Sequence, residues 1–155
     1  MPTSIFDVNI AYEPIAARLA QVDGVKAVRG VNDLTQILRG QTTGTDGYVY
    51  LYFDGVAPVE DAGNGRHQKV RVTYTVVIAS QNYNRDGMPR GVGKLIGGVM
   101  QALAGFAPLD ADERSRTRLK QVDGGEAEHL YGYSLYPLKY TLDLMYQSQV
   151  STHAP

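Results

Sequence analysis

The sequence predicts an α+β domain, with a mainly antiparallel sheet and two amphipathic helices packed on one face of it. Several segments alternate apolar and polar residues, two others repeat apolar residues every three or four positions, and the order along the chain is helix, strands, helix, strands. The 155 residues fit one domain. We expect this domain to cover residues 1–147 and residues 148–155 to form a flexible C-terminal tail.

The first helix is expected over residues 5–21, where apolar residues form a single stripe. Pro14 allows a break or a late start near Glu13. The second helix is expected over residues 92–106. Its glycines weaken it by about 1 kcal/mol each relative to Ala, but they would permit close packing onto a sheet; they are Gly93, Gly97 and Gly98.

The clearest strands are expected at residues 48–54, 69–79 and 136–146. In the first of these, three tyrosines point one way and apolar side chains point the other way. We therefore expect this strand to be covered on two sides, by its own core and by a neighbouring subunit. Short strands are expected at 25–28 and 118–122, with further strand structure from His129 onward, and 32–38 is ambiguous.

Four segments are expected to connect these elements, at residues 40–47, 55–68, 81–90 and 109–118. Residues 55–68 could form either a long loop or an extended hairpin arm. We expect this segment and residues 107–118 to contact other protein subunits.

The composition excludes some functional classes. The chain has no cysteine, so it has neither disulfides nor thiolate metal sites, and its formal net charge of −1 does not indicate a general polyanion binder. No apolar run reaches the ~18 residues that a membrane span needs, and we expect neither a secretory signal nor a membrane partner. The 11 tyrosines suit strands, and some of them could face a partner.

Candidate catalytic and binding motifs fail on spacing. Gly91 to Lys94 suggests a phosphate-binding loop, but Met88 replaces the first glycine and Leu95 replaces the hydroxyl residue that would bind magnesium. Ser134 lacks the second glycine of a nucleophile elbow.

Metal sites are not indicated either. The three histidines share no metal-ligand spacing, and the acidic residues near Asp110 are followed at once by arginines. We therefore expect no catalytic residue, no cofactor and no metal.

The whole chain resembles the tail terminator family of long-tailed phages. It is most similar to the tail terminator or tail completion proteins of Mu-like phages, and more distantly to the lambda tail terminator. The resemblance covers the end of the first helix at residues 21–25 and the segments YVYLYFDG (48–55), HQKVRVTYTVVIAS (67–80), GVGKLIGGVMQALAGF (91–106) and YPLKYTLDLMY (136–146).

This resemblance implies a structural virion protein, assembled in the host cytoplasm, that forms a ring, typically a hexamer. The ring would cap the head-proximal end of the tail tube, stop tube polymerisation and present a surface to the head–tail connector protein. Its partners would be further copies of itself, the tail tube protein and the connector, with DNA as a transient passenger through the lumen.

Charged residues of the two contact segments and the tyrosines of the first strand are the expected interface. They are Tyr48, Tyr50, Tyr52, Glu60, Asp61, Arg66, His67, Asp110, Asp112, Glu113, Arg114 and Arg116. Two alternative functions remain open from the residues alone. One is another connector, minor tail or tail tube protein, and the other is a small-molecule-binding or enzymatic α+β domain, which would need a pocket with converging polar groups.

Overall fold

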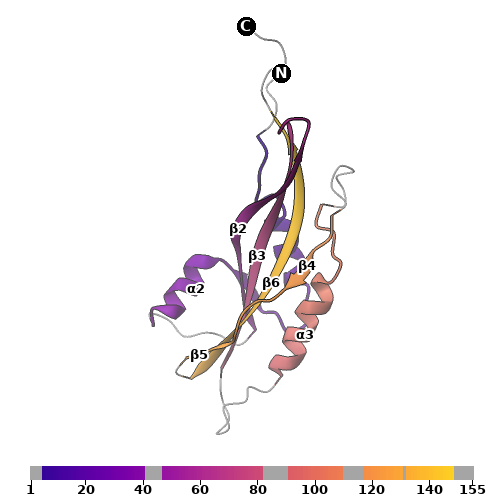
Figure 1. The fold of residues 1–155 in the computed structure, drawn as a ribbon. Coiled ribbons are helices and arrows are strands. Elements are labelled where there is room, and N and C mark those ends of the chain that lie inside the picture. Colours follow the sequence, from indigo (N-terminus) through magenta and orange to yellow (C-terminus); the bar gives the residue numbers. More distant parts are fainter. Residues whose placement is uncertain (1–4, 41–46, 82–90, 110–116, 131, 149–155) are drawn as a thin grey trace.

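A mixed six-stranded sheet with helices on both faces forms the domain (Figure 1). The structure is a computed structural model that describes residues 5–40, 47–81, 91–109, 117–130 and 132–148. Along the chain the elements are α1 (Tyr12–Ala20), β1 (Ala27–Arg29), α2 (Val31–Leu38), β2 (Tyr48–Ala62), β3 (His67–Gln81), α3 (Val92–Leu103), β4 (Lys120–Val122), β5 (Glu128–Leu130) and β6 (Tyr133–Gln147). The prediction of an α+β domain is confirmed.

The sheet is mixed because its first pair of strands differs from the rest. The strand order is β1-β2-β3-β6-β4, and β5 pairs with β6 beside β4. β1 runs parallel to β2, whereas the other pairings are antiparallel. β3 and β6 pair over 15 consecutive residues without a register shift, so they form the longest regular ladder of the sheet.

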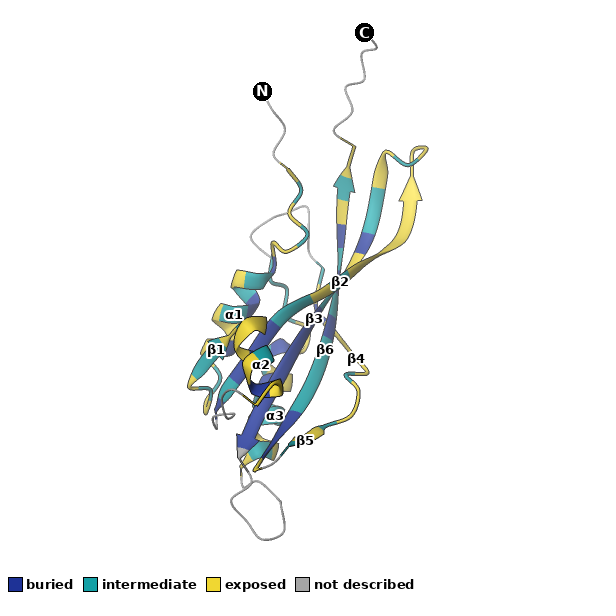
Figure 2. Ribbon diagram, turned by 90° about the vertical axis from the view of Figure 1, so that its left-hand side faces the viewer, coloured by how far each residue is buried: buried dark blue, intermediate teal, exposed yellow. Residues whose placement is uncertain are grey.

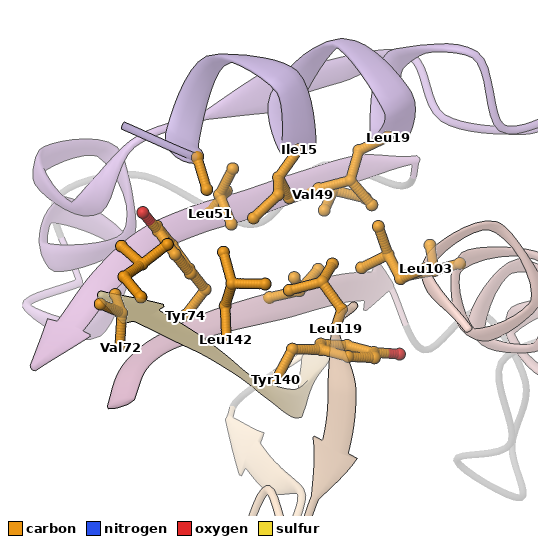
Figure 3. Close-up of a cluster of buried hydrophobic side chains, with 14 of the residues drawn as sticks. Ile15, Leu19, Val49, Leu51, Val72, Tyr74, Leu103, Leu119, Tyr140 and Leu142 are labelled. Atoms are coloured by element: carbon orange, nitrogen blue, oxygen red, sulfur yellow. The ribbon is translucent and has the colours of Figure 1, made fainter. Parts of the chain in front are cut away.

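The main core lies between the sheet and the helices α1 and α3. Ile15 and Leu19 project from α1, and Leu103 projects from α3, onto the apolar face of the sheet (Figure 3). These side chains are at most 1% exposed. Alternation along β3 supplies the other half of this core, because every second residue from Val70 to Ile78 points to the same side.

A second, smaller core lies on the opposite face, under α2. Leu34 and Ile37 of this helix pack against Tyr50, Val77 and neighbouring side chains of the sheet. The prediction of two helices on one face is therefore corrected, because α2 is a third helix and covers the other face (Figure 1). The strand expected at 48–54, which is the first part of β2, is covered on both sides as expected, but the second cover comes from the same chain.

α1 begins late, at Tyr12, instead of at residue 5. Pro14 lies in its first turn, where the missing N–H has no intrahelical acceptor and where the fixed φ suits a helix. The alternative of a late start near Glu13 is thus confirmed.

α3 ends at Leu103, earlier than the predicted end at residue 106. It ends there because Gly105 adopts a left-handed φ of 67°.

β2 and β3 are longer than the alternation indicated. Each has 15 residues, and together they form a hairpin whose turn is at residues 63–66. Of the two possibilities for residues 55–68, the extended hairpin is confirmed, and the loop is excluded. Of the connections expected at 40–47, 81–90 and 109–118, residues 41–46, 82–90 and 110–116 lie outside the described residues.

Candidate interaction surface

The most exposed regular structure is a three-stranded arm that extends beyond the helices (Figures 1 and 2). We define the arm as residues 55–62 of β2, the turn 63–66, residues 67–71 of β3 and residues 143–147 of β6. Residues 56–62 are all exposed, whereas the first part of the same strand is buried under the helices (Figure 2). The arm is therefore the part of the sheet that the chain itself covers least.

Both outer edges of the arm are unpaired within the part of the chain that the structure describes. β1 pairs with β2 only at residues 48–50, and β4 pairs with β6 only at residues 139–141. Unpaired backbone N–H and C=O groups at a strand edge can accept another strand. The arm thus offers two such edges on opposite sides.

A glycine-rich turn closes the arm. Gly63, Asn64 and Gly65 all have positive φ, and Arg66 donates its backbone N–H to the Gly63 carbonyl at 3.2 Å. Glycine adopts this conformation without steric cost, and asparagine tolerates it better than most residues. The sequence GNG therefore fixes a tight turn and keeps the two strands paired to their ends.

Three ion pairs lie on the face of the sheet opposite the main core. They join Glu60 to Lys69 at 3.5 Å, Asp143 to Arg71 at 2.9 Å and Asp54 to Lys139 at 3.2 Å. Each acid faces its base from the adjacent strand or from one strand further across the sheet. The first two pairs lie on the arm, so this face of the arm is charged but locally neutralised.

The pair between Arg71 and Asp143 is bidentate. Nε and Nη2 of Arg71 donate to the two carboxylate oxygens at 2.9 and 3.2 Å. The guanidinium holds the pKa of Asp143 below its ordinary value, mainly through this hydrogen bond. The pair fixes β3 and β6 side by side where no helix covers them.

Apolar side chains are exposed on both edge strands of the arm. Val56 is 48% exposed and Val59 is 40% exposed on β2, and Met145 is 67% exposed on β6. Such side chains gain free energy when a partner covers them, at roughly 25 cal/mol for each Å² removed from water. These exposed apolar side chains lie beside the unpaired backbone of both edges.

The N-terminal segment runs along the other face of the arm as far as Tyr146, which pairs with Gln68 next to the turn. The ring of Phe6 stacks on Tyr146 with centroids 5.0 Å apart, and the Tyr74 hydroxyl donates to Asn9 Oδ1 at 3.0 Å. Val70 and Leu144 are buried there. Residues from both ends of the described chain therefore hold this face of the arm.

The structure places the predicted interface residues in three environments. Tyr50 is 2% exposed and belongs to the second core, whereas Tyr48 and Tyr52 are half-buried at its border. Four predicted residues are exposed on the arm and its turn: Glu60, Asp61, Arg66 and His67. The remaining predicted residues lie outside the described chain; they are Asp110, Asp112, Glu113, Arg114 and Arg116.

An open groove of about 580 Å³ lies between the end of α1 and the start of α3. Arg18 and Lys94 line it, but Arg18 already connects the two helices, since its Nε donates to the Ala102 carbonyl at 3.1 Å and its guanidinium lies 5.0 Å from the Phe106 ring centroid. The groove is thus the seam between two helices. Sequence reasoning missed it, because nothing in the local pattern shows which helices are neighbours.

His129 and Ser134 form a pair that could suggest nucleophilic chemistry. His129 Nδ1 lies 2.8 Å from Ser134 Oγ. However, the Ser134 side chain is fully buried in the sheet, and a nucleophile must be reachable by its substrate. The contact instead holds β5 in register on β6, where His129 and Ser134 are paired residues.

Metal chemistry receives no support from the described residues. Within ranges 5–40, 47–81, 91–109, 117–130 and 132–148, no three His, Asp or Glu side chains are grouped closely enough to hold a metal ion. None of the helices described is long and apolar enough to cross a membrane.

The geometry thus defines a domain whose distinctive exposed feature is a strand arm with two open edges. Comparison with known proteins then gives the family. A model of the phage tail terminator protein family matches residues 4–149, almost the whole chain, and the chain belongs to this family. It is therefore a structural component of a phage tail. No curated protein matches the chain.

Proposed function

We propose that this chain is the terminator subunit of its phage tail. In this proposal, copies of the chain assemble into a ring, a hexamer, on the head-proximal end of the tail tube. The ring stops tube polymerisation and provides the surface to which the head–tail connector protein joins. Membership of the phage tail terminator family is the observation that carries the proposal.

The arm supports this proposal physically. A closed ring needs heterologous contacts, in which two different surfaces of one subunit meet. The arm offers two different strand edges, and it carries charged residues at its turn where a tube or connector subunit could contact it, notably Glu60, Asp61, Arg66 and His67. The charged residues 110–116 remain part of the proposed contact surface by sequence prediction.

The charge of the chain suits passage of DNA through the ring. The chain has 15 basic and 16 acidic residues. A strongly basic lumen would hold DNA through many phosphate contacts. We therefore propose that DNA is a passenger in the assembled tail and not a bound partner.

The proposal is tested by mixing the purified chain with polymerising tail tube protein from the same phage. We expect electron microscopy to show rings of the chain at one end of each tube, and tubes that stop growing when the chain is added. Tubes that elongate equally with and without the chain would overturn the terminator role. Long polymers of the chain alone would instead indicate a tail tube protein.

A further inference from the structure

The direction of the backbone groups on the arm can be read from one hydrogen bond. The Ser148 N–H donates to the Arg66 carbonyl at 2.7 Å, toward β3. Backbone groups alternate in direction along an antiparallel strand. The N–H and C=O groups of Asp143, Met145 and Gln147 therefore point away from β3, toward the open edge.

The same alternation fixes the outward groups of β2. Even-numbered residues of β3 bond toward β6, so odd-numbered residues bond toward β2. Their β2 partners include Gly55, Ala57 and Glu60. The backbone groups of the intervening Val56, Pro58 and Asp61 consequently point toward the open edge. Pro58 contributes a carbonyl but no N–H to this edge.

The two open edges differ in regularity. β6 pairs with β3 in unbroken register, whereas β2 has register shifts between Phe53 and Gly55 and between Pro58 and Glu60. Bulges and a proline interrupt the backbone pairing that an edge can offer to an added strand. A contact to the β2 edge is therefore short, which suits one specific junction better than open-ended stacking.

The edges also differ in charge. β2 contains three acidic residues, Asp54, Glu60 and Asp61, and no lysine or arginine. On the opposite side of the sheet, the outward residues of β6 on the arm include one acid, Asp143, which is paired with Arg71, and Lys120 of β4 lies next to this edge opposite Thr141. Like charges on neighbouring strands are unfavourable, so the acidic β2 edge disfavours a contact with the β2 edge of another copy.

From these observations we propose that the arm joins neighbouring copies of the chain: the outer edge of β2 in one copy lies along the outer edge of β6 in the next. The proposal rests on the ring proposed above and assigns its subunit junction. β2 and β6 are both antiparallel to β3, so they run in the same direction. If the sheet of one copy continues in the same sense into the sheet of the next, β2 of the first copy and β6 of the second therefore run parallel to each other.

Thiol crosslinking tests this junction, because the native chain has no cysteine to interfere. Val59→Cys marks the β2 edge and Met145→Cys marks the β6 edge, and both native side chains are exposed. We expect an equimolar mixture of the two single variants to give a dimer containing one of each when a short bifunctional thiol reagent is added. The double variant should give a ladder of crosslinked species up to the ring.

A matched control replaces the β6 edge by a site on a helix. Gln101→Cys is exposed on α3 and is mixed with Val59→Cys. Circular dichroism of each variant checks that it is folded. Loss of the mixed dimer in this control, under the same conditions, is the result that supports a specific junction.

The outcomes separate this inference from the proposed function. Rings seen by native mass measurement without the Val59–Met145 crosslink would overturn the junction and leave the terminator role standing. Dominant crosslinks between two copies of the same single variant would show an isologous contact and overturn the junction as well. Crosslinked rings that fail to stop tube growth would overturn only the terminator role, and a chain that stays monomeric in solution and on the tube would overturn both.

Discussion

Two neighbouring tyrosines in the main core differ in how their hydroxyl groups are satisfied. Tyr74 and Tyr140 are paired residues on β3 and β6 and are at most 1% exposed. The Tyr74 hydroxyl has a partner in Asn9, at 3.0 Å. Among the side chains of the described residues, the Tyr140 hydroxyl is the buried polar group that has no hydrogen-bond partner.

Removal of each hydroxyl should therefore have a different effect. We expect Tyr74→Phe to lower the free energy of unfolding by about 1 kcal/mol, because a hydrogen bond to Asn9 is lost. Tyr140→Phe should be neutral or stabilising by up to about 1–3 kcal/mol, because it removes an unsatisfied buried group. Urea denaturation of both variants measures this, and a large destabilisation by Tyr140→Phe would reveal a partner for its hydroxyl.

Burial also predicts how stability depends on pH. Burial raises the pKa of both Tyr140 and Tyr50 to about 12, from an ordinary value of 10.0. Since the folded state favours the neutral phenol, this contribution to stability is complete below pH 10.0 and is lost as pH rises toward about 12. Unfolding measured across this range should show a smaller alkaline loss for Tyr140→Phe than for the native chain; equal losses would contradict the assignment.

At the scale of elements, α3 shows how close packing depends on one glycine. We expected its glycines to allow contact with the sheet. A Cβ at Gly98 would lie 3.1 Å from Val22 Cγ1, which follows α1, whereas a Cβ at Gly97 would meet nothing within 4 Å. The close approach is thus between α3 and the end of α1, at a single position.

Alanine substitutions at these two positions form a matched pair. Gly97→Ala should raise the free energy of unfolding by about 1 kcal/mol, because alanine favours the helix and has room. Gly98→Ala gains the same helix propensity, but Val22 must move, so its net effect should be clearly smaller or destabilising. Thermal unfolding compares the two, and equal stabilisation would show that the Val22 contact is not tight.

The sequence predicted some elements well and others poorly, for physical reasons. The strong alternation in 69–79 and 136–146 identified β3 and β6, because one face of each is in the main core. α2 stayed ambiguous, since Leu34 and Ile37 are its only buried residues in a helix of 8. Without α2, the second cover of Tyr50 was attributed to a neighbouring subunit.

The arm was harder to predict than the core. Residues 55–62 lack regular alternation and include Pro58 and Gly55, which is typical of a loop. They form a strand because β3 pairs with them, and this pairing outweighs local preference. The charged residues Glu60 and Asp61 were identified as surface, but which edges stay unpaired depends on topology, which no local pattern contains.

At the scale of the whole molecule, distant segments support the arm. Phe6 comes from the N-terminal segment and Tyr146 from the last strand, and their stacked rings lie on the arm near its tip. Tyr74, in the middle of β3, is bonded to the same N-terminal segment through Asn9. The stability of the arm should therefore depend on residues before α1.

Phe6→Ala should loosen the arm more than the rest of the domain. Loss of an aromatic pair costs about 0.5–1.5 kcal/mol beyond the loss of buried area. We expect faster amide hydrogen exchange at residues 67–72 and 142–147, with little change in the parts of these strands that lie under α2. Ile5→Ala is the control, because Ile5 is 87% exposed; an equal effect from both variants would exclude a specific role for the stacked rings.

The unbroken ladder between β3 and β6 has a mechanical consequence. Its 15 residue pairs extend about 50 Å, from the domain interior to the tip of the arm, with no register shift at which it could hinge. Force applied along one strand at the tip, with its partner held at the opposite end, would load these hydrogen bonds in shear together, instead of breaking them one after another. The arm is thus a stiff extension of the sheet, and a displacement of its tip would be transmitted to the helices at its base.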